Sequence, residues 1–396
     1  MLKSLKGIRV VEMTIAGAGP ACGRILHEFG TENILVEPYN GTVSRILQGF
    51  DYYTGGKKSI VLNTKDPDGY AALCELIKTA DVFLANYRTR GLKKMGLSYE
   101  DVKKIKPDIV YATLTGFGDE GPLKEAPGNN VSAFFARGGV LGAMSQGDVL
   151  PYGTIAFGDI ATGMSLALAI MSGLYHRKVT GEGCEVHSAL MQCAYFLNHD
   201  PMIEYQHGGA FPKSRLYPSM ALVNSYPCKD GKYIYLCLAE LPQFERLLHE
   251  MGRDDLIGKW KSIADTKNEG AHEVVEILDK EFAKYTADEA VALIERADCS
   301  GQKVFMLDEV LEDPQAWANN FLYKGKDSRT GQDIIYPSLP CDVGDNAPLE
   351  YVPGPKLAAD SVALLKSIGY SEEKIQSMID RGVTRDGSQE QLKSVF

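Results

Sequence analysis

The first third of the chain alternates between short apolar runs and longer segments with one apolar face. The apolar runs have the length and the β-branched content of buried strands. They lie at 8–13, 33–36, 59–62, 82–85 and 109–113, and the segments between them predict helices at 20–29, 67–79 and 99–105. This alternation predicts an α/β fold in which a parallel, Rossmann-like sheet is joined by crossover helices.

The same pattern continues beyond residue 150. An uncharged run at 160–175 predicts a core helix over 160–178, which a turn at 180–183 connects to a strand at 184–186 and an apolar helix at 188–197. The uncharged run is shorter than the roughly 20 apolar residues that a bilayer span needs. We therefore expect a buried helix and no membrane partner.

The pattern changes near residue 200, which predicts a second domain. Residues 207–218 are rich in glycine, proline and aromatic side chains, a strand is expected at 233–238, and charged helices follow it. The segment 356–379 again predicts two helices. We expect a large α/β domain over 1–200, a smaller α+β domain over 201–325, and a return to the large domain over 326–396.

Composition and charge narrow the possible functions. The chain has 396 residues, 44% of them hydrophobic and 24% charged, which fits a folded protein of two domains. A net charge of -10 argues against binding to nucleic acid. The lysine pairs 57–58, 93–94 and 103–104 are candidates for a small polyanion, or are simply solvated surface lysines.

Cysteine and histidine give no metal-binding pattern. The eight cysteines include no Cys-x-x-Cys pair, and the seven histidines show no metal spacing. We expect reduced thiols and no bound metal. Residues 1–7 are not followed by an apolar stretch of signal-peptide length, so the expected location is cytoplasmic.

A glycine-rich turn at 16–23 follows the first predicted strand and opens a helix. Its N–H groups are suited to a phosphate, and Glu37 stands where a dinucleotide-binding fold keeps its ribose-binding acid. However, Gly17-x-Gly19 is followed by Gly23, which is one position too late, and Pro20 lacks an N–H. These residues alone leave open a nicotinamide-dependent dehydrogenase and a purely structural turn.

Asp159 stands between Gly158 and the long uncharged helix. A carboxylate at a helix start is favoured in its ionised form by the helix dipole and can act as a nucleophile. Aspartate is equally a favoured N-cap. The residues alone leave both roles open.

Further motifs around Asp159 carry a family resemblance. Gly158-Asp159 is followed by Gly163-Met164 and by Thr180-Gly181-x-Gly183. Other motifs come earlier in the chain: Leu5-x-Gly7, Ala18-Gly19-Pro20-Ala21, Lys58-Ser59-Ile60, Leu62-x-x-Lys65, Asn86-Tyr87-Arg88, Met95-Gly96-Leu97 and Thr115-Gly116-Phe117-Gly118. With these motifs the chain resembles the class III CoA-transferases, the CaiB/BaiF type, over nearly its whole length.

The resemblance implies roles for particular residues. It makes Asp159 the nucleophile, which attacks an acyl-CoA and passes CoA to a free carboxylic acid through an aspartyl anhydride and an aspartyl-CoA thioester. CoA enters as a substrate and no cofactor is bound permanently. The CoA contacts of the family fall on Ala16, Gly17, Leu62, Lys65, Asn86, Tyr87, Arg88 and Lys94.

The chain departs from the family pattern at Gly128-Asn129-Asn130, where many members have Gly-Tyr-Asp or Gly-Phe-Asp. Asn129 and Asn130 are therefore candidates for the substrate pocket. Relatives that racemise 2-methylacyl-CoA use a Gly-His-Asp there as a base, which Asn130 cannot supply. The glycine run that covers the active site in some members is also absent from 213–220.

The stretch 132–139 is most similar to members from amino-acid-fermenting anaerobes that activate 2-hydroxy acids. By that analogy the acceptors are (R)-2-hydroxy acids with an aryl or branched side chain, with oxalate or carnitine analogues as alternatives. The resemblance further implies an interlocked, ring-like homodimer. A racemase-like enzyme and a catalytically silent CoA-binding subunit are the alternative functions.

Overall fold

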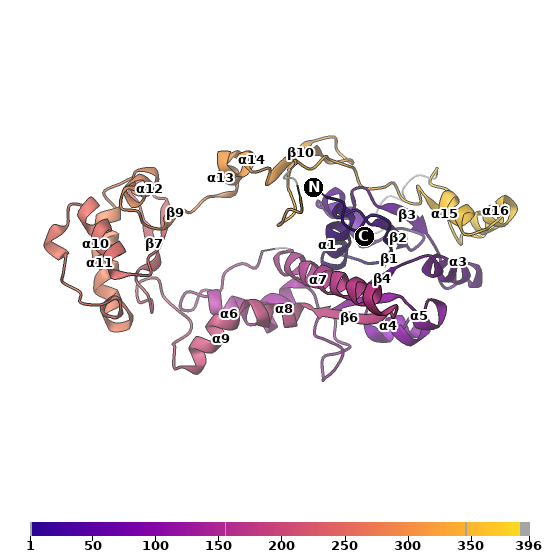
Figure 1. The fold of residues 1–396 in the computed structure, drawn as a ribbon, viewed down its shortest axis with the longest axis horizontal. Coiled ribbons are helices and arrows are strands. Elements are labelled where there is room, and N and C mark those ends of the chain that lie inside the picture. The colour runs from indigo at the N-terminus through magenta and orange to yellow at the C-terminus, as the bar shows by residue number, and fades with distance from the viewer. Residues whose placement is uncertain (1, 155, 345–346, 389–396) are drawn as a thin grey trace. The chain divides into compact units, whose positions relative to one another are not determined.

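A parallel sheet forms the centre of the first compact unit in the computed structural model, which describes residues 2–154, 156–344 and 347–388 (Figure 1). The six strands have the order β3-β2-β1-β4-β5-β6, and every neighbouring pair is parallel. They are β1 (Arg9–Met13), β2 (Glu32–Glu37), β3 (Lys58–Val61), β4 (Val82–Ala85), β5 (Val110–Thr115) and β6 (Cys184–Ala189). The predicted α/β fold and all six predicted strands are confirmed, with ends that differ by no more than three residues.

Helices cover both faces of this sheet. Side chains alternate between the two faces of a strand, so Val11 and Met13 of β1 point to one face and Val10 and Glu12 to the other. The face of Val11 and Met13 packs against a group of helices that share one apolar core: α3 (Pro67–Lys78), α4 (Thr89–Lys94), α5 (Tyr99–Ile105), α15 (Ser361–Ser367) and α16 (Glu372–Asp380). The opposite face carries α1 (Ala18–Glu28) and α7 (Phe157–Thr180), followed by α8 (Leu190–Leu197).

The strand order places a switch point beside β1. The chain runs outward from β1 to β2 and β3, and then crosses back to β4 on the other side of β1. In sheets of this kind, ligands bind outside the carboxyl ends of the strands where the order reverses. The turn after β1 and the loop after β4 therefore lie at the position that the fold favours for a ligand.

The first unit comprises residues 1–140, 153–197 and 313–396. Its last segment covers the edge strand β3, where Ser59 N–H donates to Asp360 at 2.9 Å and Val61 N–H donates to Ser361 Oγ at 3.1 Å. An edge strand without such partners would expose a row of unpaired amide groups. Further described elements of this unit are a 3-10 helix (Val43–Ile46), α2 (Phe50–Thr54), a π-helix (Asn130–Arg137), α14 (Pro314–Ala318), β10 (Leu322–Lys326) and β11 (Asp333–Pro337).

The second unit comprises residues 141–152 and 198–312. An antiparallel sheet in the order β7-β8-β9 packs against helices around Phe244, Tyr226 and Phe282, which are all fully buried. Its strands are β7 (Val223–Pro227), β8 (Tyr233–Cys237) and β9 (Gly301–Lys303). Its helices are α9 (His199–Gln206), α10 (Leu241–Glu250), α11 (Ala271–Phe282), α12 (Ala287–Arg296) and α13 (Leu307–Glu312), and α6 (Val140–Met144) begins at the boundary.

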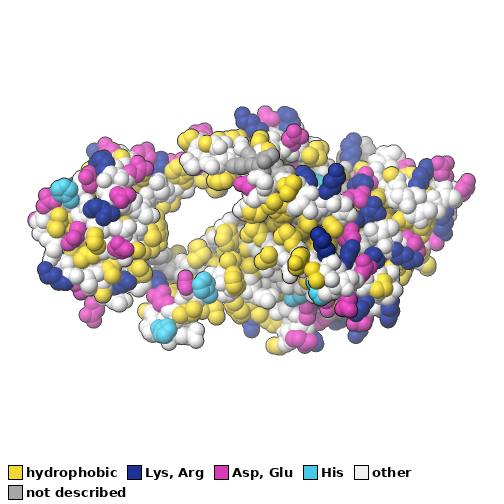
Figure 2. All heavy atoms as spheres, viewed as in Figure 1, with side chains coloured by type: hydrophobic (Ala, Val, Ile, Leu, Met, Phe, Trp, Pro, Cys, Tyr) yellow, Lys and Arg dark blue, Asp and Glu magenta, His cyan; other side chains and the backbone are white. Residues whose placement is uncertain are grey.

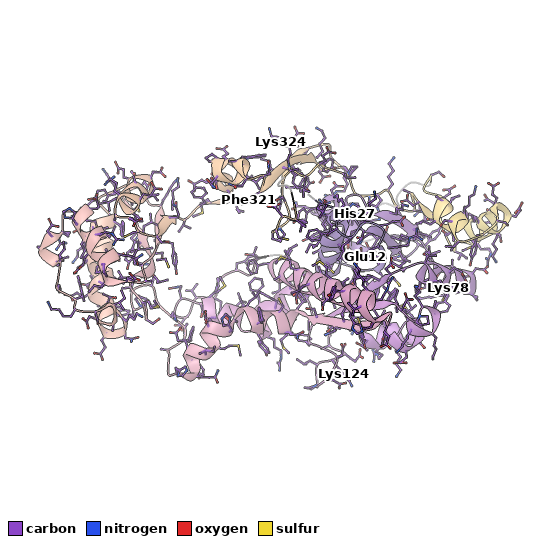
Figure 3. All side chains as sticks on the ribbon, viewed as in Figure 1. Glu12, His27, Lys78, Lys124, Phe321 and Lys324 are labelled. Atoms are coloured by element: carbon purple, nitrogen blue, oxygen red, sulfur yellow. The ribbon has the colours of Figure 1, made fainter. Side chains whose placement is uncertain are left out.

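One of the lysines considered for a polyanion site is buried. Lys57 Nζ lies 2.8 and 2.9 Å from the two carboxylate oxygens of Glu12, and both side chains are fully buried (Figure 3 labels Glu12). The same Nζ donates to Pro20 O at 3.1 Å, which ties β3 to the start of α1. The interpretation of Lys57 as a surface cation was therefore wrong, because its charge is compensated inside the unit.

Helix α7 has a largely apolar sequence, but only one of its faces is buried. Its 24 residues are long and apolar enough to cross a membrane by length and composition, although 39% of the most apolar window is buried against its own unit. Thr162, Gly163 and Leu166 face inward, whereas Leu168 and Tyr175 are more than 65% exposed. The prediction of a buried core helix is thus correct for one face only.

Candidate active site

Asp159 lies in the first turn of α7 and does not cap the helix. The N-cap is Ala156, which has a φ of 66° and offers no side-chain hydrogen bond. Among the described residues, no hydrogen bond to the Asp159 carboxylate is found. Of the two roles that the sequence left open, the N-cap role is excluded, because another residue occupies that position.

The side chain of Asp159 lies against the first βα turn. A Cβ atom added to Gly17 would come within 2.9 Å of Asp159 Cγ, so a side chain at position 17 would collide with the carboxylate. A Cβ atom added to Gly163 would lie 2.9 Å from Ala18 O and 3.0 Å from Cys22 N. The glycine at this position therefore allows helices α1 and α7 to approach closely. Two glycines thus bring a carboxylate to the N-terminus of a neighbouring helix.

The turn after β1 is held in place by a side chain that follows the neighbouring strand, β4. The Asn86 amide, which follows β4, accepts from Ile15 N–H at 2.8 Å and donates to Ile15 O at 2.7 Å. Ala16 then adopts a φ of 60°, and Gly17 is the N-cap of α1 without a side-chain bond. The turn after β1 and the loop after β4 therefore form one connected surface at the switch point.

Burial governs the titration of Asp159. Desolvation raises the pKa of its carboxyl from 3.8 to about 6, because the charged form loses hydration. Tyr53 of α2 is a neighbour, since desolvation and then the Asp159 charge raise the pKa of its phenol to about 12. Near neutral pH Asp159 is ionised and Tyr53 carries its proton.

The dinucleotide interpretation of the first turn fails at Glu37. Both Glu37 carboxylate oxygens are taken by Arg45, at 2.6 and 2.7 Å, and Ser59 Oγ adds a third bond at 2.7 Å. Glu37 and Arg45 are both buried. Since its carboxylate is committed to this ion pair, Glu37 is not available to bind a ribose.

Asn129 and Asn130 occupy two different environments. Asn129 is exposed and caps the π-helix, where its Oδ1 accepts from Val131 N–H and Ser132 N–H at 3.1 and 3.0 Å. Asn130 is buried, and its Oδ1 accepts from Gly158 N–H at 2.7 Å. Only Asn130 touches the segment that carries Asp159.

The residues considered for CoA are brought together in part. Ala16, Gly17, Asn86 and Tyr87 lie at the switch point, and burial raises the pKa of the half-buried Tyr87 phenol. Arg88 is exposed and donates to Glu125 O at 3.0 Å.

The other three lie further from Asp159 along the sheet or a helix. Leu62 is only 2% exposed and presents almost no surface to a ligand, and the exposed Lys65 follows it beyond β3, two strands away from β1. Lys94 is exposed at the last turn of α4, about 8 Å along the helix from Thr89.

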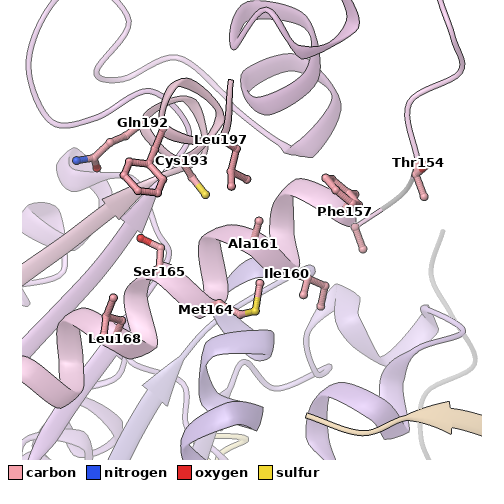
Figure 4. A pocket seen from close by; sticks show the side chains of 12 residues that line it. Thr154, Phe157, Ile160, Ala161, Met164, Ser165, Leu168, Gln192, Cys193 and Leu197 are labelled. Atoms are coloured by element: carbon pink, nitrogen blue, oxygen red, sulfur yellow. The ribbon is translucent and has the colours of Figure 1, made fainter. Parts of the chain in front are cut away.

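A cavity of about 870 Å³ lies on the other side of α7 (Figure 4). Phe157, Ile160, Met164 and Leu168 line it from α7, and Gln192, Cys193 and Leu197 line it from α8. Asp159 does not line it, because position 159 points away from positions 157, 161 and 164 on a helix of 3.6 residues per turn. This apolar cavity and the Asp159 carboxylate therefore belong to opposite faces of one helix.

The sequence did not reveal the hydrogen bond between Gly158 N–H and Asn130 or the proximity of Tyr53 to Asp159. A buried asparagine in a stretch of apolar residues was the available signal for the first, and nothing in the spacing signalled the second. Among the described residues, no group of three or more His, Cys, Asp or Glu side chains is arranged to hold a metal ion.

Comparisons with known proteins agree on one family. Residues 5–361 match the model of CoA-transferase family III. The (R)-2-hydroxy-4-methylpentanoate CoA-transferase of Clostridioides difficile is 33% identical, covering 96% of this chain and 99% of the relative. The cinnamoyl-CoA:phenyllactate CoA-transferase of Clostridium sporogenes is 34% identical, covering 94% and 95%. The crystal structure of a CAIB/BAIF family protein from Brucella suis superposes with a TM-score of 0.76 at 26% identity, covering 93% of this chain and 100% of that one.

Proposed function

The chain belongs to CoA-transferase family III and is a CoA-transferase, and from that premise we propose that Asp159 is its covalent nucleophile. The observation that carries the proposal is the state of this carboxylate. It is half-buried beside Gly17, it is ionised above about pH 6, and no described residue uses it in a hydrogen bond. A desolvated carboxylate without a structural role is available to attack a thioester carbonyl.

The proposed transfer has four steps, and in each step a bond to one group forms as another group leaves. Asp159 attacks the donor acyl-CoA, which forms an aspartyl anhydride and releases CoA thiolate. The thiolate attacks the aspartyl carbonyl, which forms an aspartyl-CoA thioester and releases the donor acid. The acceptor carboxylate attacks this thioester to form a second anhydride, and the released thiolate takes the acceptor acyl group and restores the Asp159 carboxylate.

Each tetrahedral intermediate on this route carries an oxyanion. The first-turn N–H groups of α1 have no acceptor within their own helix and lie beside Asp159, since α1 begins directly after Gly17. We propose that they donate to these oxyanions. Loss of one such donor typically costs about 3 kcal/mol of transition-state stabilisation.

The proposed CoA site follows the switch point of the sheet. Ala16, Gly17, Asn86 and Tyr87 would contact the ligand near Asp159, while three exposed cations further out would meet its phosphates. These cations are Arg88, Lys65 and Lys94. The buried Leu62 supports the core beside the site.

The proposed acceptors are (R)-2-hydroxy acids with a branched or aryl side chain, of the kind used in amino-acid fermentation. Two relatives named for such acids cover at least 94% of this chain, which supports this class. The donors would be the matching 2-enoyl-CoA or saturated acyl-CoA. We also propose that the enzyme is cytoplasmic and that CoA is its substrate, with no resident cofactor.

The experiment that tests Asp159 is peptide mass spectrometry after brief incubation with a panel of acyl-CoAs. We expect CoA attached through a thioester to the peptide that contains Asp159, and no adduct in Asp159→Ala. The fastest donors should be 4-methylpentanoyl- or cinnamoyl-type thioesters, with (R)-2-hydroxy acids as acceptors in preference to oxalate. CoA binding without any adduct would favour the silent subunit, and deuterium exchange at C2 of a 2-methylacyl-CoA would favour the racemase.

A homodimer is the proposed assembly. The α7 face that lines the cavity continues as exposed apolar side chains at Leu168, Tyr175 and Val179, which are 68, 69 and 66% exposed. Figure 2 shows hydrophobic side chains gathered over α7 and α8. Contiguous apolar surfaces of this kind mark interaction sites, and the family resemblance makes a second, interlocked copy of the chain the proposed occupant.

A further inference from the structure

Helix α7 begins without a cap of its own. Its N-cap residue, Ala156, has no polar side chain and lies in the left-handed region with a φ of 66°. The first N–H groups of any α-helix lack acceptors within the helix and need partners from outside. Elsewhere in the same unit, Asp66 and Ser98 supply such partners to α3 and α5 from the N-cap position.

Asn130 supplies the missing partner from another helix. It is 6% exposed, its Oδ1 accepts from Gly158 N–H in the first turn of α7 at 2.7 Å, and its Nδ2 donates to Thr154 O at 3.1 Å. The two partners fix the orientation of the amide, because one of them is a donor and the other is an acceptor. A carboxylate can replace only the first of these bonds.

The contact leaves no room for a side chain at position 158. A Cβ atom on Gly158 would lie 2.7 Å from Asn130 Oδ1 and 2.6 Å from Phe134 Cβ. Asn130 and Phe134 belong to the same π-helix, so one rigid element holds both the amide and the ring against the start of α7. Asp159 is the next residue along the chain.

We propose that Asn130 is a positioning residue that caps α7 from outside and thereby leaves the Asp159 carboxylate free to react. A carboxylate in the first turn of a helix can accept from N–H groups at the helix start, as the third residue of a capping box accepts from the N-cap N–H. Asn130 takes up the Gly158 N–H next to Asp159, and among the described residues the Asp159 carboxylate accepts no hydrogen bond. The proposal rests on the proposed role of Asp159 as nucleophile.

Two substitutions separate positioning from simple loosening of the fold. In Asn130→Ala, Asp159 becomes the local acceptor for the exposed N–H, so we expect the aspartyl-CoA adduct to form on the order of 100-fold more slowly. Hydrogen bonding to the ionised form should also lower the pKa of Asp159. In Asn130→Asp, a second carboxylate beside the first should raise that pKa instead.

Few other groups bear on this titration. Burial is the cause of the Asp159 shift, and Gly17 of α1, which faces it, carries no charge. Tyr53 of α2 is near enough to feel the Asp159 charge, but burial and that charge raise its pKa to about 12, far from the range of interest. If the low-pH limb of the kcat/KM profile shifts in opposite directions in the two variants, the shifts can therefore be assigned to position 130.

The matched control is Ser371→Ala, which removes the cap of α16 in the same unit. Ser371 Oγ accepts from Lys374 N–H at 3.3 Å, so its loss weakens a helix start without touching α7. Loading rate, pH dependence of kcat/KM and free energy of unfolding are measured for all three variants. We expect Ser371→Ala to lose stability but to load CoA within about twofold of the wild type.

The proposal is overturned if Asn130→Ala loads as fast as Ser371→Ala, or if both Asn130 variants move the acid limb in the same direction. A separate readout is the pH dependence of carbodiimide labelling of Asp159, which needs no turnover. If the wild type forms no adduct, the nucleophile assignment fails. The cap is still supported in that case if the labelling midpoints of the two variants move in opposite directions, and is overturned if they do not.

Discussion

The Asp159 carboxylate is destabilising where it lies. Burial favours the protonated form, and no described residue offers this carboxylate a hydrogen bond or a counter-ion, so the pKa of Asp159 rises to about 6. The ion pair between Glu12 and Lys57 is even more deeply buried, but there each charge has its partner. This difference separates the carboxylate proposed to react from one that serves the structure.

The raised pKa predicts how Asp159→Asn changes stability with pH. The folded state holds its proton up to about pH 6, whereas the unfolded state releases it near 3.8, so the stability that the protonated group contributes is lost as pH rises between these values. Asp159→Asn should therefore be more stable than the wild type at pH 8 by up to about 3 kcal/mol, and close to it at pH 4. Urea unfolding at both pH values measures this, with the exposed Glu120→Gln as control.

Activity should follow the same titration in the opposite sense. The ionised carboxylate is the proposed nucleophile, so kcat/KM for CoA transfer should fall about tenfold per pH unit below pH 6. The substrate acids remain ionised down to about pH 5. An activity that stayed constant from pH 7 to pH 5 would contradict both the pKa and the proposed role of Asp159.

At the scale of elements, the close packing of α1 on α7 positions the site. Gly163 permits it, since a Cβ at that position would meet Ala18 O, Ala21 Cβ and Cys22 N at 2.9 to 3.0 Å. Two of these three atoms belong to the backbone and cannot move aside like the end of a flexible side chain. The distance between Gly17 and Asp159 therefore depends on a glycine one turn further along α7.

Gly163→Ala should force the two helices apart. We expect a loss of about 1 to 3 kcal/mol of stability from overpacking, and slower loading of CoA on Asp159 than the stability loss alone explains. Gly142→Ala in α6 is the matched control, because nothing lies within 4 Å of its Cβ position. The control should be neutral or slightly stabilising in thermal unfolding, since alanine favours helix.

At the scale of the whole molecule, α7 has an apolar face that packing within one chain leaves exposed. Its inward face packs on α1 and the sheet, while Leu168, Tyr175 and Val179 lie in solvent. Exposure of several large apolar side chains along one helix is unfavourable in water. The proposed dimer would bury them.

Leu168→Asp should weaken that assembly. A charge placed in an apolar interface without a partner loses its hydration, so we expect the dimer to dissociate at least tenfold more readily in sedimentation velocity experiments. Ile257→Asp, on the other unit and 44% exposed, serves as the comparison and should not change the equilibrium. A wild-type chain that sediments as a monomer at micromolar concentration would contradict the proposed dimer.

The sequence by itself determined the elements of the large unit and singled out Asp159 as the candidate nucleophile. Strand periodicity and helix patterns are local properties, so all six strands were found within three residues of their ends, and the Gly158-Asp159 motif was recognisable as it stood. The π-helix, the hairpin of β10 and β11, and the inclusion of 141–152 in the small unit were not predicted. None of these has a strong periodic pattern.

Only the tertiary structure decided which contacts form around the segment that carries Asp159. Gly17, Tyr53 and Asn130 are separated from it by 29 to 142 positions, and their proximity depends on the strand order and on close helix packing. Local preference alone would make an aspartate at this helix start a cap. The chain instead places Ala156 at the N-cap and brings the Asn130 amide from another helix, and no described residue forms a hydrogen bond with the Asp159 carboxylate.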